Sequence, residues 1–576
     1  MTIGLYSNHW LQICQCIYGP SGSGISFANT AVMEKNIFCS LFEEVPMSFA
    51  DRNNPYSFNE FLDWRQGVDY YLDDPFIQKV VRHFTGEIWE QVDAEARSVS
   101  ARASFRWRDM ADRIARPELR PFMLHYDGHH NRIDRICRPR DTEILEQEIF
   151  SESFFSDKTP PWVKLVKMFL IYQNGEACVA CPITCTEGLV MLLEKYADTP
   201  ETKEILRHCK EGSDGDFAIG AQYLSEIQGG SDVPSNVLEA VNENGIWKLY
   251  GTKFFCSATH ADYAVVTAKP VGSEKVGLFV VPSWLPGNKE KEIRNGYTID
   301  RIKWKMGTSE LTTAELTFNG AVAYPVGPLD KGVANVVGIV LTYSRLTVGL
   351  SAAAFMTRAV REAEKYTSFR QAFGLLINQF PLVAVQLERI TKTTRRTAAG
   401  AFKLYRDFLK LEGGLKGSQG SDEPLPARRN RFNVRELIML QKIAASWDCT
   451  DVIREAMSLF GGHGVMEDFS SLPRLYRDSA INELWEGPRN VLLTQIHRDL
   501  QQAASWYRPE EFVAEILRET DPSLVDELSK EIRALVSHPN LFQNDDVTID
   551  VCRRWDSFCH KFFHAYQDLA LKEVEN

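Results

Sequence analysis

The sequence predicts an α+β protein in which two helical regions flank a β-rich middle region. Two patterns support this fold class. Apolar residues recur at spacings of three to four over residues 57–212 and again from Gly332, as they do on amphipathic helices. Over residues 217–329, short runs rich in β-branched and aromatic residues alternate with Gly, Asn and Pro, as they do in strands and turns.

We expect four regions in this chain of 576 residues, whose 44% hydrophobic content can fill several cores. They are an N-terminal helical domain with its extension at 1–216, a central β domain at 217–330, a C-terminal helical bundle at 331–500 and a helical C-terminal extension at 501–576. Gly, Ser and Pro interrupt the bundle at 412–426, which predicts an exposed loop between helices. Helical periodicity in the extension is clearest at 512–520 and 551–571.

The composition favours a small-molecule partner. The formal net charge is −12, whereas chains that coat nucleic acid or anionic membranes need basic surface. The longest apolar stretch, 336–356, could span a bilayer, but Arg345 lies at its middle, so we expect a buried helix. Twelve cysteines are ordinary usage for a chain of this length and lack the dense regular spacing of small secreted scaffolds, which indicates a reducing compartment. Residues 1–26 contain no Lys or Arg, so we expect an intracellular protein, with the cytoplasm favoured over the mitochondrion.

The first candidate site lies at the start of the β domain, in residues 221–233. Its local explanation is a strand followed by a glycine turn. The alternative is a flavin cradle. Gly230 would let backbone N–H groups approach a ligand, and the hydroxyls of Ser225 and Ser231 could bond a polar ring edge or a pyrophosphate.

A second segment, 251–257, supports the flavin interpretation. Phe255 and Ser257 place an aromatic ring and a hydroxyl on one strand, which suits flavin packing and hydrogen bonding. Alone, this segment would be an ordinary half-buried strand. Its position shortly after the first segment favours a cofactor site.

The second helical region adds candidate phosphate contacts. Arg370 carries a planar guanidinium that suits bidentate phosphate binding, although alone it would be a charge on a helix surface. Gly461 and Gly462 leave room for a cofactor phosphate or ribose, although alone they would form a helix C-cap.

The candidate catalytic base is Glu486, in Trp-Glu-Gly at 485–487. A lone Glu before a Gly is usually a solvated loop residue, so only the motifs that precede Glu486 support its role as a base. Taken in order, the five segments resemble those of the acyl-CoA dehydrogenase flavoproteins. The Trp-Glu-Gly form and the run Leu-Pro-Arg-Leu-Tyr-Arg at 472–477 most resemble the AidB-like branch of that family.

The resemblance implies the acyl-CoA dehydrogenase fold, with an N-terminal helical domain, a central β-barrel-like domain and a C-terminal four-helix bundle. It implies FAD as cofactor, medium- to long-chain fatty acyl-CoA as substrate and a homotetramer. Glu486 would remove the Cα proton while a hydride leaves Cβ for FAD, which gives a trans-2-enoyl-CoA. The electron acceptor, an electron-transfer flavoprotein or oxygen, is left open.

The resemblance also implies the other residues of the site. The residues implied to bind FAD are Tyr223, Leu224, Ser225, Gly230, Ser231, Phe255, Cys256, Ser257, Arg370, Phe373, Gly461, Gly462 and Asn490. The residues implied to bind substrate are Ser231, Arg345 and Arg489.

Two departures from the family pattern keep other functions open. Pro488 stands where the family has a Thr that contacts the flavin, and Arg489 adds a cation beside the base, which calls for an anionic partner. The chain could therefore sequester fatty acyl-CoA with little turnover. A further alternative is an acyl-CoA oxidase, which would use the same half-reaction but pass the electrons to oxygen. The AidB branch also includes a DNA-associated flavoprotein. We expect no nucleic-acid partner, because residues 501–576 hold eight Lys and Arg against fifteen Asp and Glu.

We predict no metal site. The cysteine run at 178, 181 and 185 lacks a second ligand pair at zinc-finger spacing, and its spacing also marks one helix face, so we expect small buried side chains. Three histidines at 125, 129 and 130 surround Asp127-Gly128, a dipeptide typical of hairpin turns.

Overall fold

The computed structural model describes residues 57–213, 215–411 and 423–576. The predicted extension before residue 57 and most of the predicted loop at 412–426 lie outside these residues. The chain divides into two compact units, and the larger one comprises Phe61–Arg370 and Leu376–Asn576. The candidate site is built almost entirely within this larger unit.

The N-terminal region is helical, with one hairpin inserted into it. Its helices are α3 (Asn59–Gly67), α4 (Pro75–Thr85), α5 (Trp89–Ala101), α6 (Arg108–Ile114), α7 (Arg140–Phe150), α8 (Pro161–Tyr172), α9 (Ala180–Tyr196) and α10 (Pro200–Glu211). The hairpin pairs β1 (Phe122–Tyr126) with β2 (Arg132–Cys137) in antiparallel fashion around the predicted turn. Exposure alternates along β1 with the period of a strand. The hairpin therefore interrupts the region predicted as helical at 57–212.

The central region is a seven-stranded sheet that closes on itself. Its strands are β3 (Gly220–Tyr223), β4 (Glu239–Glu243), β5 (Ile246–Ser257), β6 (Tyr263–Pro270), β7 (Gly277–Pro282), β8 (Tyr297–Ile302) and β9 (Thr313–Pro325). Neighbouring strands follow the order β3-β6-β4-β5-β9-β7, and β7 also pairs with β6. This second pairing of β7 closes the sheet and leaves few free edges. The predicted β-barrel-like domain is confirmed.

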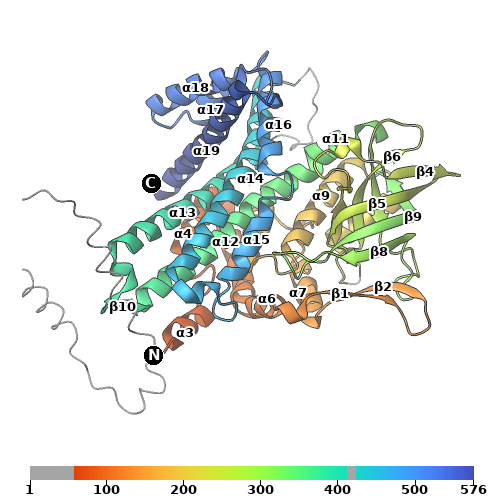
Figure 1. Ribbon diagram of the computed structural model, residues 1–576, viewed down its shortest axis with the longest axis horizontal. Coiled ribbons are helices and arrows are strands. Elements are labelled where there is room, and N and C mark those ends of the chain that lie inside the picture. The colour runs from red at the N-terminus through yellow and green to blue at the C-terminus, as the bar shows by residue number, and fades with distance from the viewer. Residues whose placement is uncertain (1–56, 214, 412–422) are drawn as a thin grey trace, which may run out of the picture. The chain divides into compact units, whose positions relative to one another are not determined.

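The C-terminal region is a helical bundle. Its helices are α11 (Gly332–Asn335), α12 (Leu341–Phe369), α13 (Pro381–Leu409), α14 (Leu425–Leu459), α15 (Leu472–Asn482) and α16 (Arg489–Ala503). Helices α12 and α14 cross closely at Gly349, where an added Cβ would lie 2.3 Å from Gln441 Nε2, so this crossing requires glycine. Figure 1 shows α12 beside α13, α14 and α15, with α9 between the bundle and the sheet.

The segment Leu329–Phe369 is long and apolar enough to cross a membrane, with a mean hydropathy of 1.5 over its most apolar window. In the structure, 83% of that window is buried inside the protein. Arg345 near its centre is only 4% exposed. Helices α8, α9, α13 and α14 pack against α12, which is the environment of a core helix.

The C-terminal extension contains α17 (Pro509–Ile516), α18 (Pro522–Val536) and α19 (Asp546–Glu575). The structure therefore lengthens the helix predicted at 551–571 and adds α18, which the periodicity had not singled out. Helix α19 packs along α13 and α14. Its buried Trp555 donates through Nε1 to the carbonyl oxygen of Leu493 at 2.9 Å, which ties the extension to α16.

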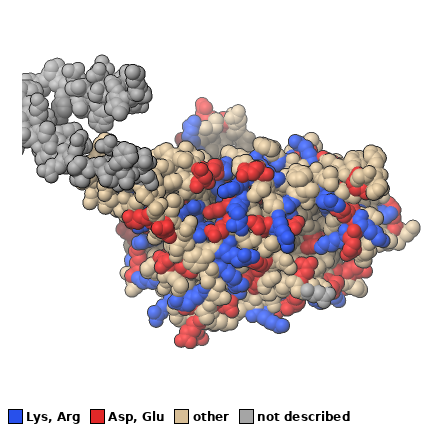
Figure 2. All heavy atoms as spheres, turned by 90° about the horizontal axis from the view of Figure 1, so that it is seen from below, with Lys and Arg blue, Asp and Glu red and all other residues tan. Residues whose placement is uncertain are grey.

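Charged side chains of both signs share the surface. In Figure 2, Lys and Arg are interspersed with Asp and Glu over the face in view.

Candidate active site

Glu486 lies in a tight turn between α15 and α16. Its φ is 59° and that of Gly487 is 97°, so two consecutive residues adopt left-handed backbone conformations. For a residue other than glycine this conformation costs of order 1–3 kcal/mol and is concentrated at functional sites. Pro488 follows at the N-cap of α16, and its carbonyl oxygen accepts from Val491 N at 3.0 Å. The missing N–H of Pro488 therefore removes no helical hydrogen bond.

Two buried cations hold this turn. Arg345 on α12 donates through Nε to the carbonyl oxygen of Glu486 at 2.9 Å. Lys442 on α14, which is 1% exposed, donates through Nζ to the carbonyl oxygens of Glu483 at 2.9 Å and Gly487 at 2.8 Å. Both cations thus bond the backbone and leave the Glu486 carboxylate to other partners. The sequence analysis missed Lys442, although a lysine within the apolar run at 437–445 was a detectable signal.

The electrostatics suit a general base. Burial raises the pKa of Glu486 to about 7, against the opposing attraction of Arg345 and Lys442. Burial also lowers the pKa of Lys442 to about 7 and that of Arg345 to about 10. A carboxyl group with a pKa near neutrality combines a usable ionised fraction with substantial basicity.

Asp478 on α15 anchors the helix that leads to this turn. It is 1% exposed and accepts from Thr308 N at 2.7 Å and from Glu176 N at 3.2 Å. At Gly307 an added Cβ would lie 2.1 Å from the carbonyl oxygen of Arg477, so only glycine permits this approach of the β domain. The helical domains and the β domain therefore meet at the base of the Glu486 turn.

A small cavity adjoins Glu486. Its volume is about 20 Å³, which is close to the space of one water molecule. Its lining combines Glu176, Ala180, Cys181, Thr184, Cys185, Val348, Ser351, Phe355, Asn482, Trp485 and Glu486.

The cysteine run contributes to this cavity. Cys181 and Cys185 lie on α9 with their Sγ atoms 3.8 Å apart. Cys178 precedes α9 and has a φ of 59°, so the three residues do not share one helix face as their spacing suggested. All three are buried, as predicted.

The two predicted flavin segments are in contact. Phe254 N donates to the carbonyl oxygen of Ser225 at 2.9 Å. Lys253, which is 1% exposed, bonds Glu226 Oε1 at 2.7 Å and the carbonyl oxygen of Leu224 at 3.1 Å. This buried pair fastens the end of β3 to β5.

The same segments connect to the Glu486 turn through α12. Gln222 on β3 donates through Nε2 to Ser344 Oγ at 3.2 Å, and Ser344 immediately precedes Arg345. Trp485 packs on the hydrophobic core of the β domain, which includes Tyr223 and Cys256. The core that contains Tyr223 and Cys256 therefore lies against Trp485, the residue before Glu486.

Several side chains in the two predicted flavin segments fit a flavin. Phe255 is 50% exposed on β5, and Lys303 Nζ lies 4.3 Å from its ring centroid. Gly230 and Ser231 are exposed, Ser225 is half-buried, and Ser257 Oγ lies 3.0 Å from Thr313 Oγ1. Cys256 is fully buried in the core, so only its backbone atoms could reach a ligand, and its predicted role in FAD binding stays a prediction.

Unpaired polar atoms provide an independent test of the fit. Tyr223 Oη, Trp485 Nε1 and Glu486 Oε2 are buried without a hydrogen-bond partner among the described residues. Each such atom costs about 1–3 kcal/mol, which a bound polar ligand would recover. A flavin and a thioester carry donors and acceptors of the required kinds, so these residues fit FAD with an acyl-CoA.

The predicted phosphate contacts lie at the other end of α12. Tyr366 stacks on Phe460 with ring centroids 4.1 Å apart, and its hydroxyl lies 3.0 Å from His463 Nδ1. These contacts place the turn of Gly461 and Gly462 beside the C-terminus of α12, where Arg370 forms the C-cap. Both glycines are exposed, with open space at the Cβ position.

Phe373 belongs to the smaller unit. There β10 (Gln371–Ala372) and β11 (Leu375–Leu376) form a hairpin. Phe373 and Gly374 both have positive φ, as a two-residue hairpin turn requires, and the Phe373 side chain is 90% exposed. Its predicted role in FAD binding stays a prediction.

The anionic partner expected for Arg489 is the carboxylate of Asp556. Arg489 Nε donates to Asp556 Oδ1 on α19 at 2.7 Å, and the guanidinium lies 4.6 Å from the ring centroid of Trp447. One Nη atom of Arg489 is buried without a hydrogen-bond partner among the described residues, and its predicted contact with substrate stays a prediction. Asn490, the next residue, is exposed on the first turn of α16.

Comparisons with known proteins agree with this geometry. Residues 221–321 match the family described as acyl-CoA dehydrogenase, middle domain, and residues 330–501 match acyl-CoA dehydrogenase, C-terminal domain. Acyl-CoA dehydrogenase family member 11 of Caenorhabditis elegans is 27% identical over 450 residues, which cover 74% of this chain and 70% of the worm protein. The putative acyl-CoA dehydrogenase AidB of Escherichia coli is 27% identical over 402 residues, which cover 67% and 70%.

A solved structure shares the fold. The crystal structure of Caenorhabditis elegans ACDH-11 in complex with C11-CoA superposes with a TM-score of 0.71 at 22% identity, over 88% of this chain and 91% of that chain. A closed β domain between two helical domains is the architecture of the acyl-CoA dehydrogenase fold. The two domain matches and the two relatives support an acyl-CoA dehydrogenase superfamily member, and FAD is the cofactor of that family.

Proposed function

We propose that this protein binds FAD and a medium- to long-chain fatty acyl-CoA and catalyses α,β-dehydrogenation with Glu486 as the base. The observation that carries the proposal is the state of Glu486. Its carboxylate is buried, its pKa is raised to about 7, and its Oε2 has no hydrogen-bond partner among the described residues. A structural carboxylate is normally paired when buried.

The residues of this chain would divide the work as follows. Glu486 Oε2 takes the Cα proton of the acyl group, while Arg345 and Lys442 hold the turn through its carbonyl oxygens. Because neither cation bonds the carboxylate in the structure, the basicity of Glu486 is preserved. Trp485 and the cavity wall exclude water, which keeps the carboxyl pKa high.

Bound FAD would supply the acceptor for the hydride that leaves Cβ. Ser225, Ser231 and Ser257 would hold its polar edges, and Phe255 would pack on its ring system. In ACDH-11 the bound ligand is C11-CoA, which supports an acyl chain of medium length for the present protein as well.

The geometry also supports an oligomer. Arg345 and Arg370 are 25 residues apart on one helix, which corresponds to about 37 Å at 1.5 Å per residue. A single flavin in contact with the Glu486 turn therefore leaves Arg370, Gly461 and Gly462 far from its phosphates in the same chain. We propose that these residues contact FAD bound by a second copy, as in a homotetramer, and that electrons pass on to an electron-transfer flavoprotein or to oxygen.

Anaerobic titration with acyl-CoAs of increasing chain length tests the proposal. We expect the flavin absorbance of the wild-type protein to bleach with the preferred chain. Glu486→Gln should bind the same acyl-CoA but reduce flavin about 10²–10⁴ times more slowly, because it lacks the base. Glu483→Gln, on the same turn, is the matched control and should bleach at the wild-type rate.

Two results would contradict this proposal. Equal bleaching by Glu486→Gln and the wild type would remove Glu486 from the base role. Tight binding of every acyl-CoA by the wild type, with no bleaching for any chain length, would favour sequestration over dehydrogenation.

A further inference from the structure

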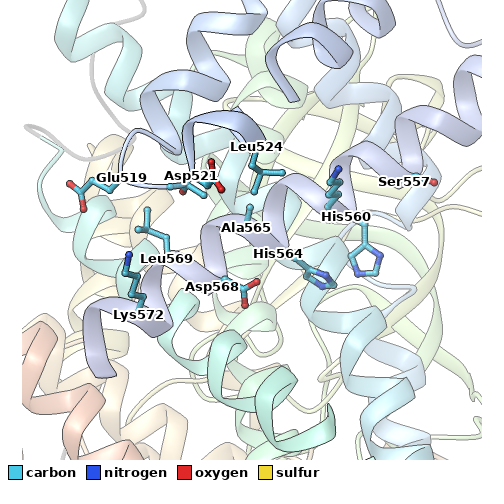
Figure 3. A pocket seen from close by; sticks show the side chains of 12 residues that line it. Glu519, Asp521, Leu524, Ser557, His560, His564, Ala565, Asp568, Leu569 and Lys572 are labelled. Atoms are coloured by element: carbon cyan, nitrogen blue, oxygen red, sulfur yellow. The ribbon is translucent and has the colours of Figure 1, made fainter. Parts of the chain in front are cut away.

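A second cluster of chemically active side chains lies outside the candidate active site, where α19 packs against α14. His560 and His564 are one helical turn apart on α19, so their side chains project from the same face. Figure 3 shows the two imidazoles side by side. Asp448 on α14 faces both: its Oδ1 lies 3.2 Å from His560 Nε2, and its Oδ2 lies 2.8 Å from His564 Nε2.

We propose that Asp448, His560 and His564 form a binding site for Zn²⁺. Two imidazole nitrogens and one carboxylate are a ligand set that Zn²⁺ commonly takes, and three protein ligands leave the fourth tetrahedral position open. The proposal departs from the sequence-based expectation of no metal site. It concerns a part of the molecule that the proposed dehydrogenation does not use.

The distances are close to those of a tetrahedral site. Bonds of 2.0–2.1 Å to one ion place neighbouring ligand atoms about 3.3 Å apart. The three ligand atoms of the cluster already lie within 4.8 Å of one another. Small side-chain rotations, with no movement of the two helices, would therefore bring all three atoms to bonding distance.

The open position has space around it. His560 and His564 line a groove of about 690 Å³ between α19 and the start of α18, together with Glu519, Asp521, Leu524 and Lys561 among others. Side-chain exposure is 31% for His560 and 21% for His564, against 9% for Asp448. The carboxylate is thus buried behind the imidazoles, and an ion can enter from the groove.

The positive charge of Arg396 on α13 lies close to the proposed zinc ligands, so removal of Arg396 tests the proposal. One of its Nη atoms lies 3.8 Å from Asp448 Oδ2 and 3.0 Å from His564 Nε2. A guanidinium at this distance repels a divalent cation. A purely structural network of Asp448, Arg396 and the two histidines would be weakened by removal of Arg396, whereas a zinc site would be strengthened.

Zinc titration of the full-length protein, with affinity tag removed and metal stripped by chelation, tests the proposal. We expect one equivalent of Zn²⁺ per chain, with binding weakened about tenfold or more in Asp448→Asn and in His560→Ala/His564→Ala. Arg396→Gln should bind zinc about tenfold more tightly. His538→Ala, in the same extension but outside the cluster, should bind like the wild type.

The gain in affinity for Arg396→Gln cannot arise from loss of folding, so it separates the zinc site from a general loss of structure. Absence of saturable zinc binding in the wild type would overturn the proposal. Binding that persists unchanged in the double histidine variant would do the same, because the ion would then reside elsewhere. Acyl-CoA titration is independent of these outcomes, so failure here leaves the proposed dehydrogenation standing.

Discussion

Glu226 is buried and Glu486 is half-buried with a buried Oε2, and each has a buried lysine nearby, but the pKa values of the two carboxyl groups shift in opposite directions. Glu226 accepts from Lys253 Nζ at 2.7 Å, from Val237 N at 2.7 Å and from Leu238 N at 3.2 Å. Its pKa is lowered in spite of burial. The pKa of Glu486 is raised to about 7, although two cations are close to it.

The difference lies in where the donors are directed. Lys253 bonds the Glu226 carboxylate itself, whereas Lys442 bonds the carbonyl oxygens of Glu483 and Gly487. Hydrogen bonds to the charged form lower a carboxyl pKa, and a cation that bonds elsewhere compensates only part of the desolvation. Burial beside a cation therefore gives a structural ion pair in one place and a candidate base in the other.

The largest expected effect is on stability, and it separates the two sites. Glu226→Gln should lower the free energy of unfolding by about 3–5 kcal/mol, because Lys253 would keep a buried charge without its partner. Glu486→Gln should leave stability at pH 8 unchanged or higher, since it removes an unpaired buried charge. Urea unfolding followed by circular dichroism measures both. Equal losses in the two variants would contradict the comparison.

The next effect concerns the pH dependence of proton removal. The charge of Lys442 lowers the pKa of Glu486, so Lys442→Met should raise the apparent pKa of flavin reduction by roughly one unit from a value near 7. Lys442 itself has a pKa of about 7, so the pH profile of flavin reduction in the wild type reports the coupled titration of Lys442 and Glu486. Stopped-flow reduction from pH 5.5 to 9 measures the shift. The exposed Lys392→Met is the control, and a profile identical to the wild type in Lys442→Met would show that the lysine acts on the backbone alone.

The smallest expected effect is on how the free energy of unfolding changes with pH. The raised pKa of Glu486 means that the folded chain binds more protons than the unfolded chain between pH 4.5 and about 7. Its contribution to stability is therefore complete below pH 4.5 and falls as pH rises to 7, by at most about 1.4 kcal/mol per unit. Glu226 has a lowered pKa, so its contribution is complete above pH 4.5 and falls at lower pH. Unfolding measured from below pH 4.5 to pH 8 should therefore show opposite trends: the difference from the wild type should change above pH 4.5 for Glu486→Gln and below pH 4.5 for Glu226→Gln.

Local sequence predicted much of the fold because the spacing of apolar residues indicates helices and strands. The helical regions, the β-rich middle and the turn at Asp127 followed from patterns within a few residues. The hairpin strands β1 and β2 did not, since each is short and a two-stranded hairpin owes its stability to tertiary packing. Helix α18 has apolar residues at helical spacing, with Leu528, Ile532 and Leu535 buried, so its pattern was present in the sequence.

For the candidate site, the sequence by itself determined that Glu486, Ser225 and Phe255 occur in an ordered set of motifs, because those residue types and spacings are visible along the chain. Only the tertiary structure decided three sets of contacts. Lys442 donates to the Glu486 turn, Arg489 pairs with Asp556, and Asp448 lies within hydrogen-bond distance of His560 and His564. The physical reason is separation along the chain. These partners are 45 to 116 residues apart, and only the packing of α14, α16 and α19 brings them together.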